Sequence, residues 1–223
     1  MARPAVPGVA RHGHDISRVV PEGTSAPASI PADVFAAAAD AYAAGRRLDM
    51  QSLARHLGVG RATLYRRAGN REQLTDEVLW WRARRLLARQ VRATSEQDGV
   101  ARITAVIGGV MRSIEQDLAL RAFIEADPEA ALRILTGTRS TVQRGMARAL
   151  ENLIDLERAR GTFATHLDTP TLAYAIMRIC EGFLYADLIA DRVRDIDRAE
   201  TVIEALLTGL DLGQRDTTVA VAT

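Results

Sequence analysis

The chain has 223 residues, of which 48% are hydrophobic, enough to bury a substantial core and too many for a disordered protein. No apolar run approaches the ~20 residues of a membrane-spanning helix and no secretory signal is visible, so we expect a cytoplasmic protein without a membrane partner. The net charge of +1 favours no partner by itself, and the single cysteine, Cys180, excludes an intrachain disulfide and is expected to be a buried, inert thiol.

Charge is distributed unevenly along the chain. Between Arg46 and Arg71 there are seven arginines and one acidic residue, Asp49, which gives this stretch a net charge of +6. From Leu86 onward, 16 arginines face 20 acidic residues. A basic N-terminal block followed by an acidic remainder is typical of a DNA-binding module joined to a module with another task.

The two ends of the chain carry little sign of regular structure. Residues 1–30 are rich in Pro, Gly, Ala and Ser and show no helical periodicity, so we expect a disordered arm there. This arm is either a solvated tail or a segment that follows the DNA backbone or minor groove. Residues 213–223 are expected to form a flexible tail.

Helix signals follow in close succession after the N-terminal arm. Pro31 favours a first helical turn, and apolar residues recur at helical spacing until Gly45. Asp49 is expected to cap a second helix that ends at Gly58, and a very short third helix follows. A long fourth helix begins after its cap residue, Asn70.

The junction of the second and third helices has the spacing of a helix-turn-helix. Ala54 is small where two helices cross, Gly58 stands where the turn needs a positive φ, and Val59 and Leu64 are expected to anchor the core. With these residues turned inward, helical geometry leaves a basic and polar outer surface for a DNA groove. That surface consists of Arg61, Ala62, Thr63, Tyr65 and Arg66.

Over about residues 31–80 the chain resembles the DNA-binding domain of the TetR family of bacterial regulators. The A-x-x-x-G-V turn, the T-L-Y helix and the N-R-E-x-L entry into the fourth helix occur in the family's order and spacing. The resemblance implies groove contacts by Arg61, Thr63 and Tyr65, and the small side chain of Ala62 permits close approach to the groove. It implies phosphate or flanking contacts by Arg46, Arg47, Gln51, Gly60, Arg66 and Arg71. The family usually has an aromatic residue where this chain has Ala68, which is the one feature that supports an alternative, a helical adaptor without DNA binding.

The rest of the chain also has helical patterns, since no stretch shows the strict alternation of a β-strand. Pro128 and Pro170 mark helix starts, and Gly161 marks an end. The sequence therefore predicts an all-α fold, with a three-helix helix-turn-helix domain over 31–80 and a helical ligand-binding and dimerisation domain over 81–212. The helices of the second domain are expected near residues 100–117, 118–126, 128–136, 138–160, 169–191 and 196–210.

Two segments within about residues 100–210 resemble the C-terminal domain of TetR-type regulators of the quorum-sensing-lactone-degradation kind. These segments read PEAALRILTGTRSTVQR and LAYAIMRICEGFLYADLIADR. The resemblance implies a small apolar inducer of the acyl or lactone type. The second segment is apolar around much of its circumference, which indicates a helix with two buried faces.

We assign one face of this helix to a ligand cavity and the other to a four-helix dimer seam. The predicted cavity residues are Ile107, Met111, Phe123, Leu135, Met146, Met177, Cys180 and Phe183, with Tyr174 and Glu181 to orient the ligand. The predicted seam residues are Tyr185, Leu188, Ile203, Leu206, Leu207 and Leu210. Ordinary core packing is the alternative for each cavity residue, a dimer-rim ion pair is the alternative for Glu181, and Tyr185 is also a candidate ligand contact.

Catalytic and metal sites are not indicated. No motif brings an acid and a base together, and His56 and His166 stand alone without metal-ligand spacing, so we expect no enzyme activity, cofactor or metal. The sequence thus predicts a homodimeric repressor of a palindromic double-stranded DNA operator, released by a small-molecule inducer.

Overall fold

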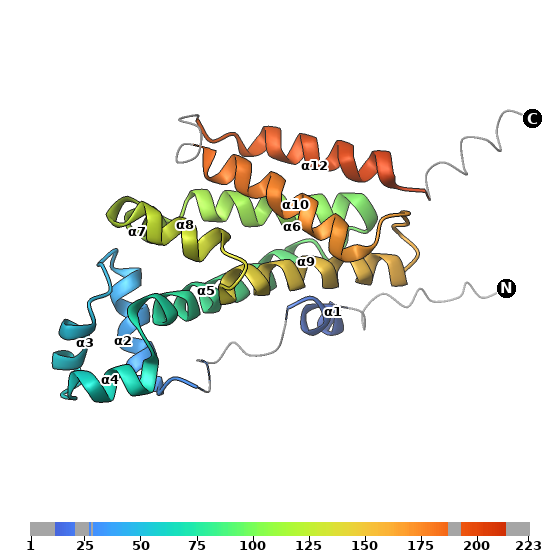
Figure 1. Cartoon of the computed structure of the whole chain (residues 1–223). Coiled ribbons are helices and arrows are strands. Elements are labelled where there is room, and N and C mark those ends of the chain that lie inside the picture. Colours follow the sequence, from blue (N-terminus) through green and yellow to red (C-terminus); the bar gives the residue numbers. More distant parts are fainter. Residues whose placement is uncertain (1–11, 21–26, 28, 187–192, 213–223) are drawn as a thin grey trace, which may run out of the picture.

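The computed structural model describes residues 12–20, 27, 29–186 and 193–212. All regular structure within these ranges is helical, which confirms the predicted all-α class (Figure 1). No helix in this part of the chain is long and apolar enough to cross a membrane. The helices are α1 (His12–Val19), α2 (Ala32–Ala43), α3 (Met50–His56), α4 (Arg61–Ala68), α5 (Arg71–Ala93), α6 (Gly99–Glu115), α7 (Leu118–Ala126), α8 (Pro128–Thr136), α9 (Thr141–Ala159), α10 (Thr169–Leu184) and α12 (Ile196–Leu210).

Helices α2, α3 and α4 form a small bundle at one end of the molecule (Figure 1). The carboxylate of Asp49 accepts hydrogen bonds from the backbone N–H groups of Gln51 and Ser52 and so caps α3. Gly58 has a φ of 65°, as the predicted turn requires. Asn70 and Gln73 form a capping box that starts α5 directly after α4. The expected elements of the helix-turn-helix are confirmed.

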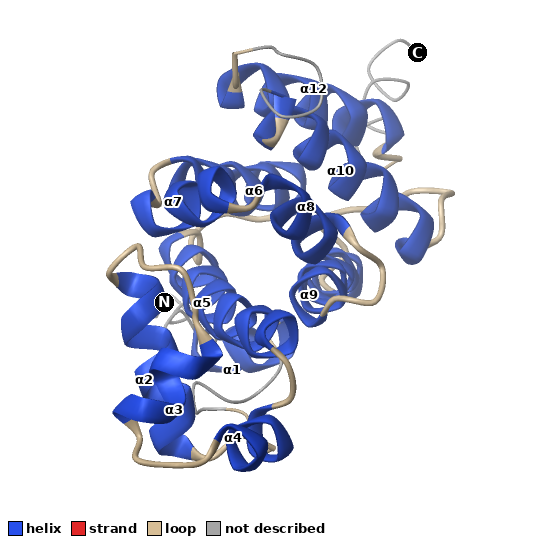
Figure 2. Ribbon diagram, turned by 60° about the vertical axis from the view of Figure 1, so that its left-hand side comes forward, coloured by secondary structure: helices blue, strands red, loops and turns tan. Residues whose placement is uncertain are grey.

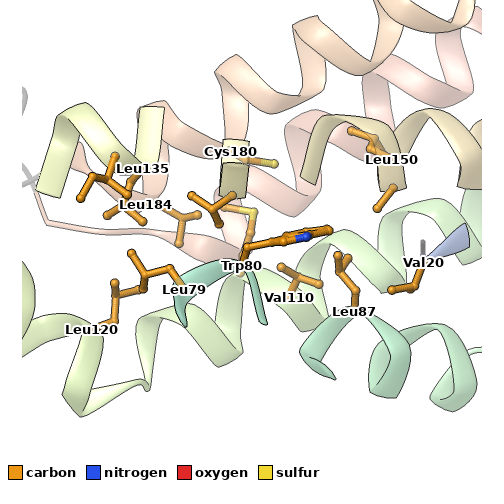
Figure 3. Close-up of a cluster of buried hydrophobic side chains, with 14 of the residues drawn as sticks. Val20, Leu79, Trp80, Leu87, Val110, Leu120, Leu135, Leu150, Cys180 and Leu184 are labelled. Carbon is orange, nitrogen blue, oxygen red and sulfur yellow. The ribbon is translucent and has the colours of Figure 1, made fainter. Parts of the chain in front are cut away.

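Helix α5 joins this bundle to the rest of the molecule. It packs against α2 of the bundle and against α1, α6 and α9 of the body. Trp80 lies in the middle of a cluster of buried apolar side chains from several helices (Figure 3). Helix α12 covers α6 and α10 on the far side (Figure 2). One continuous helix therefore belongs to both parts of the protein.

Residues 12–20 correct the expectation of an irregular arm, since they include α1. Ile16, Val19 and Val20 lie three and four residues apart and pack into the core, where Val19 is only 1% exposed. The Nδ2 amide of Asn152, on α9, donates to the carbonyl oxygen of Val19 at 3.2 Å. Because α1 rests on α5 and α9, the segment just before the helix-turn-helix belongs to the helical body. The other parts of the predicted arm, 1–11, 21–26 and 28, lie outside the described residues, as does the predicted C-terminal tail.

The helices of the body match the expected positions within a few residues, with one difference. The helix predicted to run to residue 191 ends at Leu184, and Tyr185 leaves the helical conformation with φ −113° and ψ 22°. Residues 187–192, including the predicted seam residue Leu188, lie outside the described residues.

Candidate DNA-binding surface and ligand cavity

Helix α4 presents one buried face and one accessible face. Leu64 and Ala68 are buried against the bundle, whereas Arg61, Ala62 and Arg66 are exposed. Tyr65 is 41% exposed, and the half-buried Thr63 accepts a hydrogen bond from the guanidinium of Arg66 at 3.4 Å. The side chains predicted to enter a DNA groove are therefore accessible at one end of the molecule.

The predicted phosphate contacts fall into two groups. Arg46, Arg47, Gln51 and Gly60 are exposed around α3 and at the start of α4. Arg71 instead donates to a carboxylate of the body, with 2.8 Å between its Nη2 atom and Oδ2 of Asp127. The Nη2 atom of Arg47 lies 3.6 Å from the same Oδ2. Asp127 therefore draws two of the predicted DNA contacts towards the helical body.

Asp127 belongs to a set of polar contacts that we call the interdomain seam. It connects the first turns of α5 to both ends of α8 and to the start of α9. Glu72 accepts from the Nε atom of Arg133 at 2.9 Å, and Asp76 accepts from the backbone N–H groups of Thr141 and Val142 at 2.5 and 2.9 Å. The hydrogen bond from Arg71 lowers the pKa of Asp127 because it stabilises the ionised carboxyl. No local pattern in the sequence indicates these contacts, because they join residues 56 or more positions apart.

A cavity of about 1590 Å³ lies between α1, α5, α6, α9 and α10. Figure 2 shows α5, α6, α8 and α9 arranged around this region, and Figure 3 shows apolar side chains of its walls, among them Leu87, Val110 and Leu150. The cavity exceeds the volume of roughly 300–1000 Å³ that is typical of small-molecule sites. Seven predicted ligand residues line it, namely Ile107, Met111, Leu135, Met146, Met177, Cys180 and Glu181.

Three predicted ligand residues lie elsewhere. Phe123 packs its ring against Tyr42, with 6.3 Å between ring centroids, and lines a separate void of about 30 Å³ between the two parts of the protein. Tyr174 is 63% exposed on the outer side of α10. Phe183 is half-buried and does not line the cavity. Periodicity identified these residues as apolar or amphipathic but did not show which way each one turns.

The predicted dimer seam also needs correction. Ile203 and Leu207 are fully enclosed between α12, α6 and α10 of the same chain, so they are not available to a second copy. Tyr185 is buried and lines the cavity. Leu206 and Leu210 are half-buried. The apolar stripe of α12 is used mainly within the chain, because α6 lies against it.

Polar groups in the cavity wall include some that the sequence did not single out. Glu181 accepts hydrogen bonds from Gln143 at 2.8 Å and from Arg178 at 2.5 Å, yet burial raises its pKa overall. Tyr42 of α2 and Tyr185, which directly follows α10, both line the cavity, and burial raises the pKa of each phenol. Burial also raises the pKa of Cys180 to about 12, so its thiol stays protonated. In the described ranges, no group of three His, Cys, Asp or Glu side chains could hold a metal ion.

Comparisons with known proteins agree with this architecture. Residues 98–208 match the family model described as "Tetracyclin repressor-like, C-terminal domain". The chain is similar to the solved structure of the R. erythropolis transcriptional repressor QsdR from the TetR family, with 33% sequence identity and a TM-score of 0.71. That match covers 80% of this chain and 93% of QsdR. The transcriptional regulator FadR from Bacillus subtilis, solved in complex with stearoyl-CoA, is similar in fold, with 15% identity, a TM-score of 0.52, and coverage of 80% and 98%. No curated protein matches the chain.

Proposed function

Since this chain belongs to the TetR family of transcriptional regulators, we propose that it is a homodimeric repressor that leaves its operator when a small molecule fills the cavity. One observation carries this proposal. Helix α5 begins directly after the accessible helix α4, and farther along the same helix Leu79, Trp81 and the residues that follow line the cavity. A ligand that shifts α5 would therefore also shift α4.

DNA recognition would use two copies of α4, one from each subunit. In a dimer these helices enter successive major grooves about 34 Å apart on a palindromic site. Arg61, Thr63 and Tyr65 would contact base edges, and the exposed Arg46, Arg47, Gln51 and Gly60 would contact or approach the phosphates.

Dimerisation would use the outer faces of α10 and α12. Tyr174 and Val202 are large apolar side chains that stay 63% and 41% exposed in the single chain. Half-buried Phe183, Leu206 and Leu210 lie on the same two helices. Pairing α10 and α12 with their copies in a four-helix arrangement would remove this apolar surface from water.

Release of DNA would follow from a difference in ligand affinity between two arrangements of the dimer. A nearly complete switch requires the ligand to bind the released arrangement about 10⁴-fold more tightly than the DNA-bound one. The mainly aliphatic cavity wall favours an apolar inducer of the acyl or lactone type.

Gel-shift titration of the DNA upstream of the gene tests the DNA-binding half of the proposal. We expect Arg61→Ala and Tyr65→Ala each to weaken binding about tenfold or more while the dimer persists in size-exclusion chromatography with light scattering. Arg148→Ala is the matched control, because this exposed arginine lies on α9, outside the α2–α4 bundle, and its removal changes the net charge by the same amount.

Two results would count against the proposal. Full affinity in both α4 variants would favour the adaptor alternative, in which DNA binding has been lost. A complex that stays on DNA while a ligand saturates the cavity would refute induced release.

A further inference from the structure

The hydroxyl of Tyr42 is a buried polar group that the fold leaves without a hydrogen bond. Tyr42 lies in the last turn of α2 and is 7% exposed. Its Oη atom makes no hydrogen bond with any of the described residues. Because a buried hydroxyl without a partner destabilises a fold, this group requires an explanation beyond packing.

Neighbouring side chains hold the ring but do not satisfy its hydroxyl. The guanidinium carbon of Arg82 lies 5.1 Å from the ring centroid, and Phe123 packs against the ring. Asp117 is close enough to influence the Tyr42 phenol, but both of its oxygens are engaged. Oδ2 accepts from Arg82 at 2.8 Å, and Oδ1 accepts from two backbone N–H groups as the cap of α7. Turning Asp117 towards Tyr42 would break these bonds.

Tyr42 occupies the place where the cavity meets the DNA-binding bundle. It lines the large cavity, and it also lines the small void beside Arg47 and Asp127. Tyr42 and Ala43 are the residues that α2 contributes to the cavity wall. A ligand bonded to this hydroxyl would therefore touch the bundle directly as well as α5.

The groups around this end of the cavity favour a neutral ligand. Asp117 and Glu181 both line the cavity, and each is already paired, with Arg82 and Arg178 respectively. A carboxylate placed here would meet two carboxylates whose arginine partners are engaged. Four further arginines of α5 line the cavity. Arg84 and Arg85 lie over the rings of Trp80 and Trp81, at 5.6 and 4.9 Å from the ring centroids. Exposed Arg89 and Arg92 lie seven and ten residues beyond Arg82, about 10 and 15 Å farther along the helix.

We propose that Tyr42 is a ligand-contact residue that recognises the carbonyl oxygen of a neutral amphiphile. The phenol donates one hydrogen bond to that oxygen, and the hydrocarbon part of the ligand lies along the aliphatic wall formed by residues such as Leu87, Val110 and Leu150. Burial keeps the phenol protonated, which suits a donor. This inference rests on the proposed ligand cavity and names the chemical class and the polar anchor of its occupant.

Tryptophan fluorescence tests the inference without DNA. The chain has two tryptophans, Trp80 and Trp81, which are consecutive residues of α5. The purified full-length protein is titrated with γ-decalactone and methyl decanoate as neutral carbonyl probes and with decanoate as the anionic probe. Tyr42→Phe removes only the hydroxyl, and Thr138→Val is the control, because it removes an exposed hydroxyl between α8 and α9 that does not line the cavity.

We expect at least one neutral probe to bind the wild type and Thr138→Val with equal Kd. Tyr42→Phe should raise that Kd about tenfold, because it leaves the buried carbonyl unpaired. Decanoate should bind at least tenfold more weakly than the neutral probe and should not respond to Tyr42→Phe. In the absence of probe, Tyr42→Phe should melt at the same temperature as the wild type or higher, because it removes a group that the fold does not satisfy.

Four results would overturn the inference. The first two are an unchanged Kd for the neutral probe in Tyr42→Phe and tighter binding of decanoate than of the neutral probe. The third is the absence of saturable binding of either neutral probe by the wild type. The fourth is a lower melting temperature of Tyr42→Phe than of the wild type without probe. The last result would show that the hydroxyl already has a partner within the fold. The fluorescence titrations contain no DNA. A failed gel shift would therefore refute the repressor role without affecting the conclusion about Tyr42, and a failed titration would refute the role of Tyr42 without affecting the conclusion about DNA binding.

Discussion

Replacing Asp127 with asparagine should tighten DNA binding. Oδ2 of Asp127 holds Arg71 at 2.8 Å and lies 3.6 Å from Arg47, whereas Oδ1 accepts from the backbone N–H of Ala130 and caps α8. Asparagine is as good a helix cap as aspartate, so the variant removes the charge and keeps the cap. Both arginines are predicted phosphate contacts, and the substitution frees them for DNA.

The size of the effect follows from the exposure of the ion pair. The side chains of Arg71 and Asp127 are 33% and 27% exposed, and such a pair changes an equilibrium constant by a factor of about two to five. Two copies in a dimer give about four- to twenty-five-fold tighter binding. If Arg71 reaches a phosphate, Arg71→Ala in both subunits should reduce the slope of log K against log salt by about 1.8.

Fluorescence anisotropy of an operator fragment between 50 and 200 mM salt measures both quantities. Asp168→Asn is the matched control, because Asp168 also caps a helix, α10, and the substitution changes the net charge equally without touching the interdomain seam. Equal affinities for Asp127→Asn and Asp168→Asn would show that Arg47 and Arg71 do not compete between Asp127 and phosphate.

Three further predictions concern packing and pH. Gly145→Ala would place a Cβ atom 2.5 Å from the Trp80 ring and should destabilise the fold by about 1–3 kcal/mol in urea unfolding; a gain in stability would contradict this packing. Because the folded pKa of Glu181 is raised above its ordinary 4.5, its ionisation costs stability as the pH rises through that pKa. The melting temperature of Glu181→Gln should therefore exceed that of the wild type increasingly as the pH rises towards 8, and the two should show no such difference below about pH 4.5. Val19→Asp should release α1, seen as faster hydrogen exchange in residues 12–20 and in the facing part of α9; unchanged exchange would argue against this docking.

Local signals in the sequence were enough for the helix-turn-helix. A cap residue, a glycine with positive φ and a capping box act within a few positions of the chain, so Asp49, Gly58 and Asn70 could be interpreted without knowing the fold. The same local rules missed α1. Eight residues are too few for a stable isolated helix, and α1 exists because α5 and α9 supply an apolar surface for Ile16 and Val19.

The orientation of side chains in the body could be predicted only in part. Seven of the ten predicted cavity residues do line the cavity, because apolar positions on its helices must face inward somewhere, but most of the wall residues on α6 and α9 were not predicted. Periodicity does not tell whether an apolar face meets a cavity, a neighbouring helix or a second chain, which explains the errors at Ile203 and Leu207. Tyr42 lies within the first predicted helix, between Pro31 and Gly45, and only tertiary packing brings it to the cavity wall.

The two binding events proposed for this protein act on the same short stretch of structure. The first turns of α5 are held to the body by Arg71, Glu72 and Asp76, and the middle of α5 lines the cavity. A phosphate that binds Arg71 would weaken this seam, and a ligand in the cavity would contact the middle of the same helix. Binding linkage is reciprocal, so if a ligand weakens operator affinity by a given factor, the operator must weaken ligand affinity by the same factor. Titrating a neutral probe with and without operator DNA, and operator DNA with and without the probe, should give the same factor. Asp127→Asn weakens the interdomain seam and should change the two factors by the same amount.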